Sequence, residues 1–135
     1  MNENDAVKPL RVTLMVIGVL FIVALYPLSI FWPTGWTWHA TGHSAYLQMI
    51  MGVYATLGVF LLRAARNPLE NLSLIWFTVW SSIVHGGIMA AQAVVEPNQR
   101  GHLIGDVPAM WLIAAVLAGV TLRAQMPGVA TRGAT

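Results

Sequence analysis

The chain contains no cysteine and very little charge. Only 9% of its 135 residues are Asp, Glu, Lys or Arg, whereas soluble domains carry about a quarter. The absence of cysteine excludes a disulfide framework, thiol redox chemistry and thiolate metal sites, so a metal ion would have to be held by His, carboxylate or Met. The scarcity of charge beside 57% hydrophobic residues indicates an integral membrane protein, and at this length it leaves no separate soluble catalytic domain.

Four apolar segments stand out, each about the length that crosses a bilayer. They predict helices at about residues 10–32, 44–63, 68–95 and 106–123. The first helix is expected to bend near Pro27, and the tail 127–135 is expected to be disordered. Together the segments predict an all-α fold, an antiparallel four-helix transmembrane bundle that forms a single integral membrane domain over residues 1–135.

The basic residues indicate the orientation, because cytoplasmic flanks of membrane helices collect Lys and Arg. One side of the predicted bundle holds six of the seven: Lys8, Arg11, Arg63, Arg66, Arg123 and Arg132. Only Arg100 falls on the other side. Both termini are therefore expected in the cytoplasm. Because the basic residues are scattered along the membrane edges, nucleic acid is not an expected partner.

Two local patterns predict helix starts. Asn67, Pro68 and Glu70 fit an N-cap, a proline at the first helical position and a reciprocal glutamate, which together form a capping box. Gly105 and Asp106 resemble the start of the fourth helix, where Asp106 would act as an N-cap. The third and fourth helices are thus expected to begin at these residues.

His85 lies near the middle of the third apolar segment and is the leading functional candidate. An ionisable side chain there costs roughly 2.5 kcal/mol or more unless it is paired or faces a polar interior. At about 100° per residue, it shares a helix face with Thr78, Ser81, Met89, Gln92 and Glu96. Trp76 and Trp80 lie opposite and are expected to face lipid. On the second segment, the face expected to pack against this helix is small and polar: Ser44, Gln48, Gly52 and Ala55.

These faces predict a polar pocket around His85 that opens outward. On the fourth segment, Asp106 and Met110 share one side and are expected to border it. The candidate ligand-binding residues are His85, Gln48, Ser81, Gln92, Asp106 and His102. His85 and His102 are also candidate metal ligands. Trp36 and Trp38, which flank Thr37, could close over the pocket.

Simpler interpretations stay open for the same residues. His85 could be a structural residue that hydrogen-bonds a Ser, Thr or Gln of a neighbouring helix, and Asp106 could be an N-cap alone. His39, His43 and His102 could be solvated residues of loops. The i, i+4 spacing of His39 and His43 matches no specific metal motif.

Four stretches of the sequence carry a family resemblance: WPTGW at 32–36, QMIMGVYATLG at 48–58, LIWFTVWSSIVHGG at 74–87 and RGHLIGDVP at 100–108. They resemble a family of small bacterial membrane proteins known only as a domain of unknown function. The resemblance implies a four-helix, multi-pass protein of the bacterial inner membrane and implies no activity. More loosely, the layout is similar to that of DoxX-like proteins.

Three functions are compatible with the sequence. The first is a non-enzymatic module, either an accessory subunit or a binder of a lipophilic molecule, with membrane lipids around it and homo-oligomers formed through its small-residue faces. The second is a metal or quinone redox site at His85 and His102, where a two-histidine haem is disfavoured because only His85 lies well inside the membrane. The third is a membrane enzyme or transporter in which His85 shuttles a proton with Asp106 or Glu96.

Reporter fusions test the orientation. Fusions in the loop 33–43 should report the exterior and fusions in the loop 63–71 the cytoplasm, because the basic residues retain the second loop inside. The reverse pattern would contradict both the orientation and the outward-opening pocket.

Overall fold

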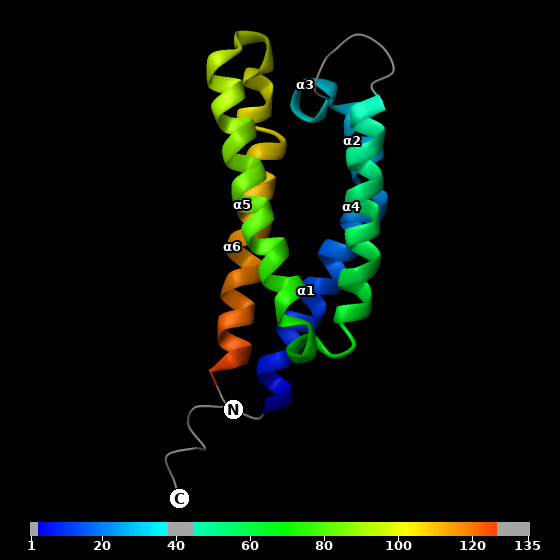
Figure 1. The fold of residues 1–135 in the computed structure, drawn as a ribbon, viewed down its shortest axis with the longest axis vertical. Helices are drawn as coiled ribbons and strands as arrows, with labels where there is room; N and C mark the ends of the chain where they lie inside the picture. The colour runs from blue at the N-terminus through cyan, green and yellow to red at the C-terminus, as the bar shows by residue number, and fades with distance from the viewer. Residues whose placement is uncertain (1–2, 38–44, 127–135) are drawn as a thin grey trace, which may run out of the picture.

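The computed structural model describes residues 3–37 and 45–126, with side chains from Ala6 onward. In these ranges the chain is helical and contains no strand (Figure 1). The elements are α1 (Glu3–Val23), α2 (Leu25–Phe31), α3 (Pro33–Trp36), α4 (Ala45–Ala64), the 3₁₀ helix η1 (Pro68–Asn71), α5 (Leu72–Val95), the 3₁₀ helix η2 (Pro97–Leu103) and α6 (Asp106–Gln125). The predicted all-α fold is confirmed. The tail expected to be disordered lies outside the described residues.

Four stretches are long and apolar enough to cross a membrane: Ala6–Val23, Ala45–Ala64, Pro68–Val95 and Pro97–Gln125. Figure 1 shows that α1 begins and α6 ends at the same end of the bundle. This is the arrangement expected when an even number of helices crosses a bilayer. Length and composition therefore suggest a membrane protein.

The first predicted helix is divided in two. α1 starts earlier than expected, at Glu3, and ends at Val23, and α2 continues from Leu25. Pro27 has no N–H to donate to the carbonyl of Val23, and its ring crowds that carbonyl. The neighbouring backbone bond from Leu28 N to Ala24 O is kept at 3.0 Å. The break therefore lies at Ala24, one turn before the proline that causes it.

The capping box predicted before the third helix is wrong. Asn67 makes no side-chain cap bond, and its Nδ2 donates instead to Glu70 Oε2 at 3.3 Å. Pro68 begins the short 3₁₀ helix η1, and α5 starts only at Leu72. The fourth helix begins at Asp106 as expected, so the N-cap position is occupied by Gly105, which has no side chain to form a cap bond.

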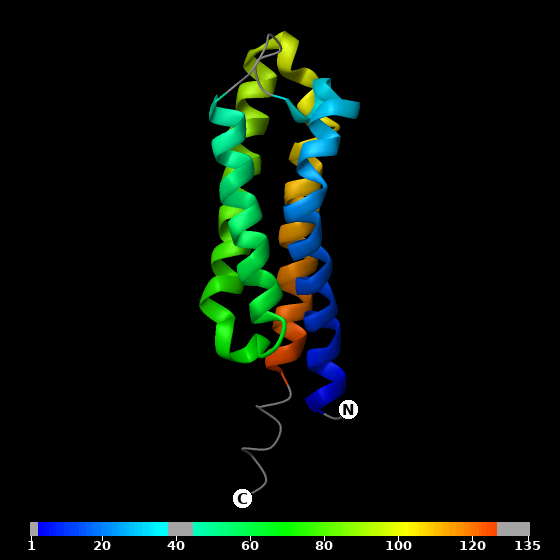
Figure 2. The same cartoon turned by 90° about the vertical axis from the view of Figure 1, so that its right-hand side faces the viewer.

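The long helices form two pairs. α1 packs along α4 and α5 packs along α6, while α1 also contacts α6 and joins the pairs. α4 and α5 hardly touch each other, and Figure 1 shows the pairs diverging towards the end that carries α3. Figure 2, turned by 90°, shows α1 and α4 running side by side. The buried apolar core comprises Leu10, Leu14, Ile17, Phe21, Leu61, Ala64, Ala65, Ile75, Val79, Met110, Ala114, Leu117 and Ala124.

Two glycines let the backbones of α1 and α4 meet. A Cβ atom added to Gly58 would lie 2.6 Å from the carbonyl oxygen of Gly18, and one added to Gly18 would lie 2.9 Å from that of Gly58. Small residues allow this close approach in membrane helix pairs, where van der Waals packing drives association. The crossing of α1 and α4 therefore depends on both glycines.

The predicted inner face of the second helix is wrong at two of its residues, although Ala55 is half-buried. Gln48 and Gly52 of α4 are exposed, and a Cβ atom at Gly52 would have no neighbour within 4 Å. Leu47, Met51 and Tyr54 line the space between the helix pairs instead. The helix is thus rotated by about one residue, or roughly 100°, from the expected orientation. Ser44 lies outside the described residues.

The orientation expected for the third helix is confirmed at Trp80, whose side chain is 61% exposed. Trp76 is instead half-buried and packs against the core. Across the helix, Thr78 is fully buried and hydrogen-bonds the carbonyl of Leu74 at 2.9 Å. The helix face that Thr78 shares with His85 was predicted to point inward, and this is correct at Thr78.

The glycine contact makes a matched stability test possible. Gly58→Ala should lower the free energy of unfolding by about 1–3 kcal/mol, because the added methyl group meets backbone that cannot move aside. Gly52→Ala should be neutral or stabilising by up to about 1 kcal/mol, because the site is open and alanine favours helix. Unfolding by SDS in mixed micelles, followed by circular dichroism, measures both changes. Equal destabilisation by both variants would contradict the crossing.

Candidate ligand pocket

A pocket of about 80 Å³ lies between the two helix pairs. Most of its wall is apolar and consists of Leu25, Leu47, Ile50, Met51, Met89 and Met110. Four polar side chains also line it, and each comes from a different helix: Trp36 of α3, Tyr54 of α4, His85 of α5 and Asp106 of α6. A mainly apolar pocket with a few convergent polar groups is the usual form of a small-molecule site.

Tyr54 connects the two helix pairs. Its ring packs edge-on against Phe21 of α1, with a centroid distance of 5.0 Å, and against His85 of α5, at 5.8 Å. Its hydroxyl donates to Met110 Sδ of α6 at 3.4 Å. The sequence analysis missed this residue. The signal was present, because Leu47, Met51 and Tyr54 follow a helical i, i+4, i+7 spacing.

His85 faces the pocket, and its side chain is half-buried. Among the described side chains it makes no hydrogen bond, and its ring lies perpendicular to the ring of Tyr54. The structural interpretation of His85 required a bond to a Ser, Thr or Gln of a neighbouring helix. No such bond is formed within the described part of the chain, so the ring nitrogens are available to groups in the pocket.

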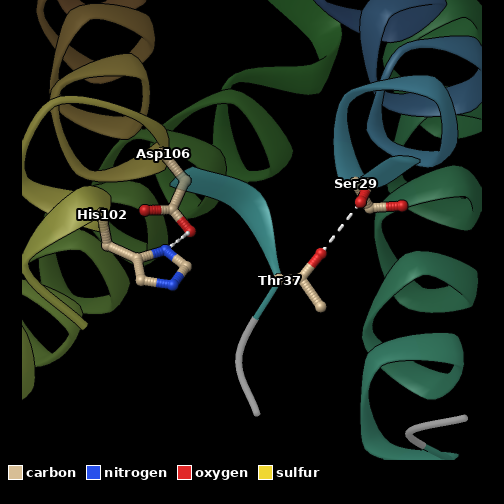
Figure 3. Close-up of polar contacts among 4 residues, drawn as sticks. All are labelled: Ser29, Thr37, His102 and Asp106. Carbon is tan, nitrogen blue, oxygen red and sulfur yellow. Dashed lines mark hydrogen bonds and ion pairs between the residues drawn. The ribbon is translucent and has the colours of Figure 1, made fainter. Parts of the chain in front are cut away.

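Asp106 is held by His102 (Figure 3). Nδ1 of His102 donates to Oδ2 of Asp106 at 2.8 Å, and the two residues are only 0% and 6% exposed. The carboxylate can only accept, which assigns the hydrogen to Nδ1. The interpretation of His102 as a solvated loop residue is therefore wrong. Asp106 is not merely an N-cap either, because its carboxylate binds a histidine.

The α3 turn closes this end of the bundle by packing directly on η2 and the start of α6. A Cβ atom at Gly101 would collide with the carbonyl of Thr34, and one at Gly105 would collide with the backbone of Gly35. Only glycine permits such an approach between two backbones. Figure 3 shows that Thr37, just after α3, donates to the carbonyl of Ser29 at 3.0 Å, which ties the turn back to α2.

Trp36 is brought into the pocket by this turn. Its Nε1 is buried and has no hydrogen-bond acceptor among the described residues. A buried indole N–H normally finds a partner, and leaving it unpaired costs free energy. The pocket thus presents a donor that suits an acceptor oxygen.

Several predicted site residues do not belong to this pocket. Gln48 and Gln92 are exposed, and Ser81 uses its hydroxyl to bond the carbonyl of Thr78 at 3.2 Å. None of the three lines the pocket. Of the helix face predicted to surround His85, Met89 lines the pocket with it. Trp38, His39 and His43 lie outside the described residues.

The structure adds no further ligand side chains to the predicted metal ligands His85 and His102 within the described residues. Within 6–37 and 45–126 there is no group of three or more His, Cys, Asp or Glu side chains arranged to hold a metal ion. Asp106 is the carboxylate that lines the pocket with His85, and it binds His102. The metal site stays a prediction without a ligand set.

The fold and the pocket define a small all-α protein with four helices able to cross a membrane. The chain belongs to a family of unknown function (DUF6632), whose model matches residues 5–133. No curated protein and no solved structure matches the chain. The looser similarity to DoxX-like proteins stays a prediction. The chemistry of the pocket therefore has to be inferred from its own residues.

The buried pair gives a prediction about stability. Asp106→Ala should lower the free energy of unfolding by about 3 kcal/mol, because it leaves His102 buried without its acceptor. Glu96→Ala, at an exposed carboxylate, should change it by no more than about 0.5 kcal/mol. SDS-induced unfolding of the two purified variants measures the difference. If Asp106→Ala unfolded like the unmodified chain, the pair would not be structural.

Proposed function

We propose that this protein binds a lipophilic molecule whose polar head carries an acceptor oxygen, in the pocket between its two helix pairs. The observation that carries the proposal is the convergence of Trp36, Tyr54, His85 and Asp106 from four helices on one otherwise apolar pocket. The four residues meet only when the helices pack together, and their meeting is not needed to form any single helix.

The size of the pocket supports a head-group site. A volume of about 80 Å³ is well below the several hundred Å³ of sites that enclose a whole ligand. It has room for a small ring or a hydroxyl group, or for a few waters. The apolar remainder of the ligand would extend between α4 and α5, which barely contact each other.

The polar residues support a carbonyl or hydroxyl head. Trp36 offers a buried N–H donor, and a His85 ring nitrogen can donate or accept. A quinone or a long-chain alcohol has matching oxygen atoms. Binding accounts for these features without electron or proton transfer, so a redox site and a proton-transferring enzyme or transporter remain secondary candidates.

The proposal includes a location. We place the protein in a bacterial inner membrane with both termini in the cytoplasm, so that the pocket lies towards the exterior. The support is the gathering of exposed basic residues where α1 begins and α6 ends: Lys8, Arg11, Arg63, Arg66 and Arg123. An accessory or homo-oligomeric role fits α4, whose membrane-length stretch is the least buried of the four.

Retention of a co-purified ligand tests the proposal. The detergent-purified chain should carry a lipophilic molecule that mass spectrometry of an organic extract identifies. Trp36→Phe removes the donor and keeps the aromatic ring, and it should reduce occupancy about fivefold, the value of one hydrogen bond. His85→Gln should also lower occupancy while the protein stays folded.

Trp80→Phe is the matched control, because it makes the same change at an exposed position of α5. It should leave occupancy unchanged. Full occupancy in both Trp36→Phe and His85→Gln would remove the pocket from consideration and leave the accessory-subunit interpretation. Circular dichroism of each variant separates loss of ligand from loss of fold.

A further inference from the structure

A second groove lies at the other end of the bundle, where α1 passes the connection between α4 and α5. Its volume is about 200 Å³, and its lining is Val7, Arg11, Arg66, Asn67, Pro68, Leu69 and Glu70. The candidate ligand pocket between the helix pairs shares no residue with it. The groove therefore needs its own explanation.

Two arginines line this groove, Arg11 from α1 and Arg66 from the connection between α4 and η1. Arg11 Nη2 donates to the backbone carbonyl of Arg66 at 3.3 Å. Both side chains are exposed, and among side chains 6–37 and 45–126 neither lies within 4.0 Å of a carboxylate oxygen in an ion pair. Glu70, the acidic residue of the groove, accepts a hydrogen bond from Asn67 at 3.3 Å. Two like charges that line one groove favour a shared anion.

The groove also has an apolar wall. Val7 is half-buried, Pro68 is buried and Leu69 is 36% exposed. The stretches that can cross a membrane begin at Ala6 and at Pro68, so Arg11 lies near the start of the first and Arg66 just before the second. The groove thus lies where the polar end of the bundle meets its apolar body, which is the depth of lipid headgroups.

We propose that this groove binds the phosphate of an anionic phospholipid. The guanidinium groups of Arg11 and Arg66 donate to the phosphate oxygens, for which their fork geometry is suited. Val7 and Leu69 contact the apolar part of the same molecule. A lipid is favoured over free phosphate because the free ion would make no use of this wall.

Native mass spectrometry of the full chain in detergent tests the proposal, with phosphatidylglycerol and phosphatidylcholine of the same acyl chains as probes. Phosphatidylglycerol should bind more tightly. Arg11→Gln and Arg66→Gln should each weaken it about tenfold or more, as expected for a charge-assisted hydrogen bond to an ion. Arg123→Gln, at an exposed base of the same end, should weaken it at most about fivefold, the effect of one surface charge.

Three results would overturn the proposal. Equal effects of all three substitutions would mean that only general surface charge attracts the lipid. Equal binding of the two lipids would mean that the anionic headgroup is not recognised. Full competition by inorganic phosphate at millimolar concentration would identify a free-ion site. Since all three arginines are exposed, circular dichroism should show unchanged helix content in each variant.

Discussion

The direct contact between the backbones of α1 and α4 at Gly18 and Gly58 determines how the rest of the bundle is arranged. Because no side chain separates the helices there, they run as one unit, and α1 keeps its remaining apolar side for α6. On the other pair, Gly86 admits Trp111 in the same manner, since a Cβ atom there would lie 2.7 Å from Trp111 Nε1. Both pairs are tight, while α4 and α5 hardly meet. The pocket is the space that this unequal packing leaves between the pairs.

The α3 turn and the His102–Asp106 pair depend on each other in closing that space. A buried pair of this kind is favourable only when its geometry is good and its surroundings satisfy it. The 2.8 Å bond joins the end of η2 to the first residue of α6, directly beneath the glycines on which α3 rests. The bond therefore fixes the surface against which α3 packs, and this in turn fixes the position of Trp36. His102 therefore positions the pocket, although it does not line it.

Hydropathy and length were sufficient to predict the four long helices, because every crossing needs a continuous apolar stretch. The direction of His85 and the shared side of Asp106 and Met110 were also predictable, since an isolated polar group inside a membrane helix turns inward. The inner face of α4 was not predictable. That helix is nearly apolar all round and little buried, so its pattern does not distinguish the Tyr54 face from the Gln48 face. His102 lies in η2, which packs against α3, a segment distant in sequence, and no local pattern predicts that contact.

Within a bilayer, the energetics of both proposed sites differ from those of a soluble pocket. Lipid tails are as apolar as leucine side chains, so moving the apolar part of a ligand from lipid to protein gains little. Selectivity must then come from the polar groups: the Trp36 N–H and His85 in one site, and the two guanidinium groups in the other. A hydrogen bond to the Trp36 N–H also removes the free-energy cost of leaving a buried donor unpaired. That cost is larger in an apolar pocket than in water. A small pocket that receives only the head of a ligand is therefore sufficient for discrimination, and a larger apolar cavity would add little affinity.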